Sequence, residues 1–335
     1  MNQINNNNQE KLGLYALKTL AALFVVMTHV PTANKATLLP FILVAVPCFY
    51  LISGYFLYTG DNETEIKKSK SWISKLVKTS LILHVIVLLS IRKIDNPITD
   101  VLVPVLLTGS GYLWYLNAMW QALLIFILVR KFLPEKIIYA APVLYLFSLL
   151  FGKYVFLMSD VPCSFPQWTR MNFLFTAIPF LSTGYLISKH KAQFTGKFRW
   201  LLLTIISIVS LYTEILIYRE FKPYNSSGYF LSLFPLALCL FVLFLNINKI
   251  PGRWITYIGK YNTSHIYYFH PLIHYGVKAS ITTSFLKSII TIYPFLVFLL
   301  SIFLSALINY LSSKIPHKKI FVSIFNAYRY YKKSE

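Results

Sequence analysis

Negative charge is scarce in this sequence. Only 11 Asp and Glu residues stand among 335, against 32 Lys and Arg, and charged residues of both signs make up 13% of the chain. Soluble domains carry roughly 25% charged residues, and a soluble fold could not cover a chain that is 56% hydrophobic. The sequence therefore excludes an ordinary soluble domain and makes the bilayer the solvent in which each polar residue is judged.

Cysteine is rarer still. Cys48, Cys163 and Cys239 lie far apart in the chain, and two of them fall inside apolar runs. This spacing indicates neither a disulfide framework nor a zinc site. The sequence also lacks a Gly-x-Ser-x-Gly elbow and a Walker-type glycine loop, so serine hydrolases and P-loop ATPases have no support.

What the sequence does contain is a succession of apolar runs, several close to the roughly 20 residues that cross a bilayer as a helix. They predict an all-α membrane bundle of about ten transmembrane helices, in a single domain over residues 1–335. In the segment 94–111 only Val101 to Leu107 is apolar, which is short, so we expect the segment to be re-entrant or interfacial. If it crossed, every later orientation would invert. The expected helices are 13–30, 38–58, 76–91, 112–130, 137–151, 172–188, 201–218, 229–246, 263–279 and 289–312.

The positive charge of the chain lies mostly in the short loops between these runs. In a soluble protein a net charge of +21 would indicate nucleic acid binding through phosphate contacts. Here, placing the N-terminus in the cytoplasm puts most of the 32 Lys and Arg residues on the inner side, as the positive-inside rule requires. We therefore expect both termini inside, with 1–12 and 313–335 as cytoplasmic tails, and no nucleic acid partner.

Ionisable residues within the spans are the first candidates for function, because they are costly in a bilayer. Lys18 and His29 are 11 residues apart, which places them on one helical face, about 16 Å apart along the axis. One end of that face could meet an anionic ligand while the other reaches the outer leaflet. The structural alternative is that Lys18 extends to the inner headgroups and His29 merely ends the helix before Pro31.

Further candidates lie in later spans. Glu214 is deep in the expected seventh span and either pairs with a neighbouring cation or acts in catalysis. His270 and His274 share a helical face at i, i+4, but a third ligand and the glutamate of a His-Glu-x-x-His site are missing, so we predict no metal. Arg170, before the sixth span, either anchors to headgroups or grips a substrate phosphate.

Several of these segments together resemble the integral membrane acyltransferase 3 family, in its short form without a fused esterase domain. The first is the helix from Lys18 to His29, and the second is Phe49-x-x-x-Ser53-Gly54-Tyr55. Weaker similarities follow in order along nearly the whole chain. Lys18 departs from the pattern, because the family usually has arginine there, and lysine is not equivalent at a bidentate phosphate site. The third main segment is Tyr112-Leu113-Trp114-Tyr115-Leu116-Asn117-Ala118, and the weaker ones are Thr169 to Asn172, Gly184-Tyr185, Glu214 and Tyr267 to His270.

The resemblance implies transfer of an acyl group, most often acetyl from acetyl-CoA, to a hydroxyl of an envelope polysaccharide or a lipid-linked glycan precursor. It implies a bacterial cytoplasmic membrane, no bound cofactor, and the bilayer, acyl-CoA and the glycan as partners. His29 would act as the general base or as a nucleophile carrying the acyl group, and Glu214 would be the second catalytic residue. The residues expected to contact substrates are Lys18, Ser53, Trp114, Asn117, Arg170 and His270.

Some alternatives stay open on the sequence. Trp114 could stack on a sugar or adenine, yet tryptophan is also a common interfacial anchor. The expected topology puts His29 on the outer side, whereas the thioester of acyl-CoA is cytoplasmic. Three arrangements would resolve this: the donor inserts its pantetheine arm through the helix bundle, the acyl group is transferred across the membrane, or the acceptor is reached from the inner side. A transporter or exporter of a glycan or lipid-linked sugar would have similar helices, whereas an envelope polymerase would carry a larger outer loop.

Overall fold

The computed structural model describes residues 11–90, 96–109, 111–158, 171–221, 228–250, 252–280 and 283–314. These residues form helices and no strand, which confirms the all-α prediction. Within them, six stretches are long and apolar enough to cross a membrane: Leu12–His29, Lys35–Leu57, Asn62–Leu88, Ile98–Phe132, Lys197–Phe221 and Tyr293–Leu311. The chain is therefore a multi-pass helical membrane protein, while ten crossings and cytoplasmic termini stay predictions.

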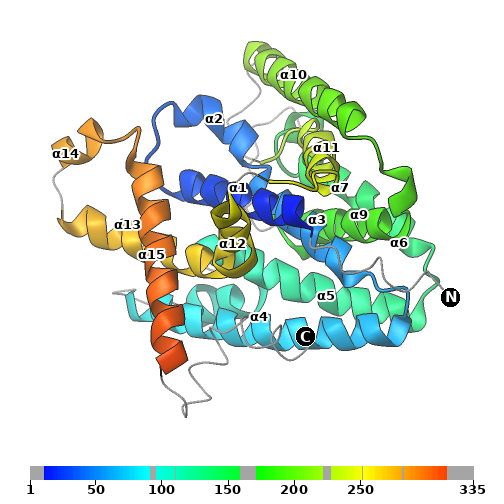
Figure 1. Cartoon of the computed structure of the whole chain (residues 1–335), viewed down its shortest axis with the longest axis horizontal. Coiled ribbons are helices and arrows are strands. Elements are labelled where there is room, and N and C mark those ends of the chain that lie inside the picture. Colours follow the sequence, from blue (N-terminus) through cyan, green and yellow to red (C-terminus); the bar gives the residue numbers. More distant parts are fainter. Residues whose placement is uncertain are drawn as a thin grey trace.

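Helix α1 (Leu12–His29) lies in the middle of the bundle, with α10 (Lys197–Phe221) and α4 (Asn62–Ser90) at opposite edges (Figure 1). One stripe of α1, at helical spacing, belongs to the main core, and a second stripe belongs to a smaller core built with later helices. The first stripe contains Leu14, Leu17, Ala21 and Val25, and the second contains Ala22, Val26 and Val30. The central helix thus joins the two cores.

Two glycines permit a close helix crossing. Gly54 on α3 (Ala45–Leu57) and Gly184 on α9 (Ile178–Lys189) face each other's backbones. A methyl group added at Gly54 would lie 1.9 Å from the Leu181 carbonyl oxygen, and one at Gly184 would lie 2.0 Å from that of Leu51. Only a residue without Cβ permits this approach, so the glycine of the Ser53-Gly54 segment has a packing role.

Helices α4 and α5 (Trp114–Phe132) form an antiparallel pair, because the Asn62 side chain at the start of α4 donates to the Arg130 carbonyl near the end of α5, at 3.2 Å. Between them lie the π-helical turns η1 (Ile98–Leu102) and η2 (Pro104–Thr108) and the 3-10 turn η3 (Gly111–Leu113). The chain therefore leaves α4 and enters α5 at the same end of the bundle, as expected for a re-entrant 94–111 segment.

Several expected helices differ in detail. The range 38–58 is divided into α2 (Lys35–Ile42) and α3, because Pro47 cannot donate to the Leu43 carbonyl and its ring crowds that oxygen. Helix α4 begins well before 76, since the polar segment ahead of it is rich in good helix formers. The amphipathic helix α12 (Arg253–Tyr261) was not expected, because its apolar face is too short for a hydropathy signal.

The other expected ranges are helical with modified bounds. Residues 137–151 form three short pieces, α6 (Ile137–Ala140), the 3-10 turn η4 (Ala141–Leu144) and α7 (Tyr145–Leu150). The remaining elements are η5 (Val155–Leu157), η6 (Phe173–Ala177), η7 (Lys191–Gln193), α11 (Leu233–Leu245), α13 (Thr263–Ser280), α14 (Thr283–Ser288) and α15 (Tyr293–Lys314).

Candidate active site

His29 is the last residue of α1. The next residue, Val30, is extended at φ −106° and ψ 159°, the conformation favoured before a proline, so Pro31 ends the helix at this point. The flanking Val26 and Val30 are fully buried, whereas His29 is exposed. The imidazole therefore stands at an open edge of the core, on a rigid element.

His270 on α13 lies against His29, with 5.3 Å between the ring centroids. It is fully buried, at 0% exposure. Its Nδ1 lies 3.0 Å from the Ile266 carbonyl oxygen, within hydrogen-bond distance. Nδ1 must therefore carry the proton, which leaves Nε2 as a buried acceptor with no partner among the described residues.

Tyrosines pack around the two histidine rings. The Tyr112 centroid lies 6.3 Å from His29 and 6.0 Å from His270, and Tyr267 lies 6.1 Å from His270. The Tyr267 hydroxyl donates to the Tyr112 carbonyl, which ties α13 to η3. Tyr115 contacts Tyr267 at 5.5 Å and extends the aromatic surface toward α3. It is thus Tyr112, two residues before Trp114, that approaches the histidines.

One lysine and a third histidine lie near the open side of His29. Lys35 donates to the Val30 carbonyl at 3.1 Å and, like His274, is close enough to act electrostatically on His29. The Nδ1 of His274 lies 2.8 Å from the Tyr293 hydroxyl. The described residues contain no group of three or more His, Cys, Asp or Glu that could hold a metal ion, and the absence of a metal stays a prediction.

The remaining predicted binding residues are dispersed. Lys18 on α1 and Ser53 on α3 are half-buried, and the Lys18 ammonium makes no hydrogen bond or ion pair within the described part of the chain. Trp114 begins α5 and packs its half-buried ring against the main core. Arg170 lies outside the described residues. Of the predicted substrate contacts, the structure brings His270 to His29.

Glu214 has partners of its own on another side of the bundle. Its two carboxylate oxygens accept from the backbone N–H groups of Leu231 and Ser232, at 2.6 and 2.7 Å, and it also accepts from the Tyr154 hydroxyl. These N–H groups precede α11, whose start is favoured by a negative charge. No cation lies within ion-pair distance among the described residues, so the expected pairing with a neighbouring cation is not seen there.

Asn117 holds the re-entrant segment in place. Its side chain is fully buried, accepts from the Ser80 hydroxyl at 2.7 Å and donates to the Pro104 and Val105 carbonyls at 3.0 and 3.1 Å. Gln121, one turn later, donates to the next two carbonyls of the segment. With its amide satisfied in this way, Asn117 is bonded as a structural residue.

Replacing Asn117 by leucine is expected to loosen residues 104–107, because the Ser80 hydroxyl and two carbonyls lose their partner, at about 1–3 kcal/mol for each buried group left unpaired. Thiol labelling of a cysteine introduced at Val103 measures the effect and should speed up in Asn117→Leu. Thr99→Ala, on the exposed part of the segment, is the control and should label as the parent does. Equal labelling in all three proteins would contradict the role of Asn117.

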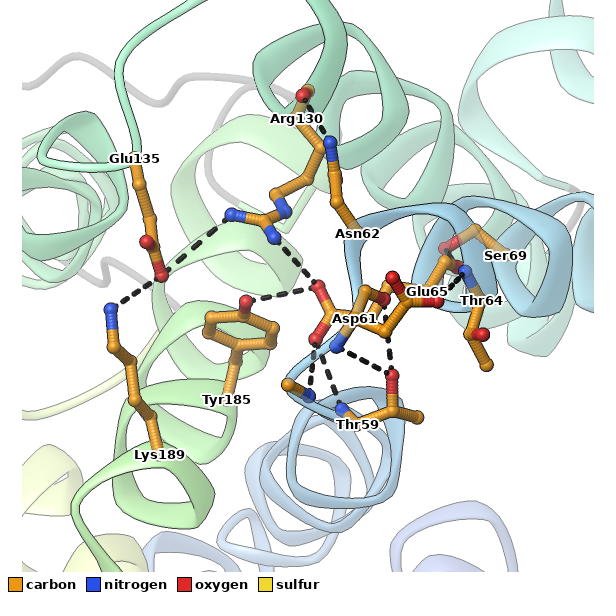
Figure 2. Close-up of polar contacts among 11 residues, drawn as sticks. Thr59, Asp61, Asn62, Thr64, Glu65, Ser69, Arg130, Glu135, Tyr185 and Lys189 are labelled. Carbon is orange, nitrogen blue, oxygen red and sulfur yellow. Dashed lines mark hydrogen bonds and ion pairs between the residues drawn. The ribbon is translucent and has the colours of Figure 1, made fainter.

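A second polar cluster lies where α4 begins and α5 and α9 end (Figure 2). Glu65 is fully buried, at 0% exposure, and its Oε2 lies 3.2 Å from Arg130 Nη2. The other oxygen accepts from the N–H groups of Thr59 and Gly60, at 3.0 and 3.2 Å, and the Tyr185 hydroxyl donates to Oε2 at 3.0 Å. Every lone pair of the buried carboxylate thus faces a donor.

The cluster continues outward from Arg130. Figure 2 shows its guanidinium between two carboxylates, with Nη1 3.7 Å from Glu135, which in turn lies 2.6 Å from Lys189. At the start of α4 the exposed Asp61 accepts from the Thr64 N–H at 2.8 Å, and this bonding to Thr64 lowers the pKa of Asp61. Three loops expected on the inner side therefore meet at one end of the bundle.

Sequence reasoning did not single out this cluster. The available signal was compositional, since Glu65 is one of only 11 acidic residues and stands in a lysine-rich segment. Nothing local to the sequence connects it with Arg130, because the pair is made by the return of α5 alongside α4. The same holds for Tyr112 beside His29.

Comparison with known proteins identifies the family to which the chain belongs. Residues 12–314 match the sequence pattern of the acyltransferase 3 family, described as an acyltransferase domain. Two relatives from Enterococcus faecalis, both named amino-acid racemase, are 28% and 24% identical over 274 and 261 residues. The alignments cover 72% and 70% of this chain, which spans only 37% of the length of each relative. No solved structure matches the chain.

Proposed function

Because the chain belongs to the acyltransferase 3 family, we propose that it transfers an acyl group, most often acetyl, from acyl-CoA to a hydroxyl of an envelope polysaccharide or a lipid-linked glycan precursor. The observation that carries the proposal is the pairing of His29 with His270, 5.3 Å between centroids. One imidazole is exposed and the other is buried with an unpaired acceptor nitrogen in the described structure. This arrangement suits one base and one supporting group.

In the proposed reaction, a nitrogen of His29 takes the proton from the acceptor hydroxyl while its oxygen attacks the thioester carbonyl. The tetrahedral intermediate then collapses, the carbon–sulfur bond breaks, and the leaving thiolate takes the proton back from His29. The products are an ester and free coenzyme A, and the histidine returns to its neutral form. His29 fits the base role because it is exposed at a helix end.

His270 is a positioning residue in this scheme. Its Nδ1–H donates to the Ile266 carbonyl, so Nε2 can only accept a hydrogen bond. Once His29 has taken the proton, both of its nitrogens carry hydrogen, and one of them could donate to His270 Nε2. An acceptor beside an imidazolium orients and stabilises it, as the third member of a catalytic triad does.

The surroundings fit an acceptor that carries hydroxyl groups and negative charge. Tyr112 and Tyr267 present flat faces beside the histidines, and aromatic surfaces suit the apolar face of a sugar ring. Lys35 supplies positive charge, which would stabilise the oxyanion of the tetrahedral intermediate or a phosphate on the acceptor. We assign this end of α1 to the outer side of the bacterial cytoplasmic membrane. We give Glu214 no role in the proposed reaction, because its carboxylate already accepts three hydrogen bonds within the protein.

The proposal is tested by deleting the gene and analysing the surface glycan for ester-linked acyl groups. Esters should fall to background in the deletion strain and return when the wild-type gene is supplied, with the amount of surface glycan unchanged. Glycan retained inside the cell, with its decoration intact, would instead favour an exporter. Unchanged esters in the deletion strain would contradict the proposal.

A further inference from the structure

A cavity lies against α12 at the end of α1 opposite to His29. Its cavity volume is about 370 Å³, and the residues that matter for its chemistry are Tyr15, Arg253, Thr256, Tyr257, Lys260 and Tyr261. This volume falls within the range of about 300–1,000 Å³ that small-molecule sites occupy. No step of the proposed reaction uses these residues.

Helix α12 is held firmly against α1. A methyl group added at Gly259 would lie 1.8 Å from the Tyr15 carbonyl oxygen, so the two backbones touch. Near the other end of α12, the Thr19 hydroxyl donates to the Ile255 carbonyl at 2.6 Å. The cavity walls are therefore fixed relative to α1, which favours a preformed site.

The walls combine cations with aromatic rings. Lys260 lies over Tyr15 and Tyr261, at 5.8 and 5.2 Å from the ring centroids, and the Tyr257 and Tyr261 rings are 4.9 Å apart. With Arg253, the lining residues that the structure describes include two cations and no carboxylate. Such a wall suits phosphates together with a flat ring, because guanidinium binds phosphate bidentately and tyrosine faces stack on bases.

Electrostatics beside the cavity agree with an anionic ligand. Lys11, which directly precedes α1, lies within hydrogen-bond reach of Lys191. Burial, followed by the neighbouring Lys191, lowers the pKa of Lys11 to about 8. The start of α1 therefore has a surplus of positive charge that a bound anion would relieve.

We propose that this cavity binds the nucleotide end of the acyl donor, with the phosphates on Arg253 and Lys260 and the base against Tyr257 and Tyr261. The inference rests on the proposed acyl-CoA-dependent function and adds the place where the donor enters. In this arrangement the nucleotide of the donor lies at one end of α1, beside Tyr15, and the reaction takes place at the other end, beside His29.

The distance along α1 is compatible with a long donor arm. Tyr15 and His29 are 14 residues apart, which corresponds to about 21 Å at 1.5 Å per residue. Lys18 lies between them, one turn from Tyr15. The extended pantetheine arm of coenzyme A would have to pass this lysine to present its thioester to His29, so the donor reaches the reaction through the bundle.

The inference is tested by equilibrium binding of coenzyme A to the full chain in phosphatidylcholine nanodiscs, with pantetheine, which lacks the nucleotide, as a second probe. Arg253→Gln and Lys260→Gln should each weaken binding of coenzyme A about 10-fold or more, because a hydrogen bond to a charged group is lost. Lys249→Gln, an exposed lysine outside the cavity, is the matched control. Pantetheine binding should not change in any variant.

The outcomes separate the cavity from the proposed function. If the two variants bind coenzyme A more weakly but the wild type transfers no acyl group, the proposed coenzyme A site is supported and the proposed function is wrong. Acyl transfer with an unchanged KM for acyl-CoA in both variants would overturn the cavity and retain the function. If coenzyme A does not bind and the two residues instead determine association with phosphatidylglycerol, the cavity is a lipid headgroup site and the inference is wrong.

Discussion

Replacing His29 by alanine is expected to lower the rate of acyl transfer by about 10²–10⁴-fold, the range contributed by a positioned general base. The acceptor hydroxyl would then have to lose its proton to water. Water reaches the site only at its exposed edge, because the surrounding core is apolar. The measurement is transfer of labelled acetyl from acetyl-CoA in vesicles that contain the purified protein. Exogenous imidazole should restore part of the rate, because it can occupy the space left by the side chain.

His270 allows a sharper test of the same pair. If its Nε2 stabilises the imidazolium of His29, His270→Ala should reduce the rate strongly in the presence of His29 and much less in its absence, because residues that act as a unit are not additive. The rate of the double variant should therefore lie within a few fold of the rate of His29→Ala. His190→Ala, a histidine bonded to Tyr139 elsewhere, controls for the loss of an imidazole. A His29→Ala protein with the wild-type rate would rule out the base role.

Replacing Glu65 by alanine is expected to destabilise the protein by about 3–5 kcal/mol, because it leaves a buried guanidinium without its carboxylate. Arg130 is only 12% exposed, and the carboxylate that would remain near it, Glu135, is 36% exposed and 3.7 Å away. The N–H groups of Thr59 and Gly60 also lose their acceptor, which adds to the cost. The measurement is the free energy of unfolding in detergent micelles on titration with denaturing surfactant.

Two further variants separate the causes in this cluster. Glu135→Gln removes a carboxylate that is 36% exposed, so it should cost at most about 1 kcal/mol, as partly exposed ion pairs do. Replacing Glu65 and Arg130 together by methionine should recover much of the stability lost by Glu65→Ala, since no uncompensated charge remains. A Glu65→Ala protein as stable as Glu135→Gln would show that Arg130 finds another partner or water.

The pattern of the sequence predicted the class of the protein and much of its course through the bundle. The apolar runs predicted the helices because hydropathy and helical period are local properties of the chain. The placement of His29 at a helix end followed from Pro31, again a local effect. Residues 98–108 form short turns between the antiparallel helices α4 and α5, while the re-entrant or interfacial placement of 94–111 stays a prediction.

Local patterns were less informative where a residue had two possible uses. Asn117 was expected to contact substrate because of the family resemblance. Glu214 was expected to pair with a cation or to act in catalysis, because charged groups inside spans are costly. In the structure, Asn117 bonds the carbonyls of η2, and Glu214 accepts from the N–H groups before α11. A buried polar residue requires partners, but the sequence does not show whether those partners belong to a ligand or to the protein's own backbone.

The sequence by itself determined that this protein is an apolar, basic helix bundle with a histidine at the end of its first helix, because composition and periodicity follow from single segments. Only the tertiary structure decided what that histidine meets. His270 reaches it from 241 positions later in the chain, and Glu65 meets Arg130 across another helix pair. Such meetings depend on how closely helices approach, as at Gly54 and Gly184, and no periodicity within one helix encodes the position of its neighbour.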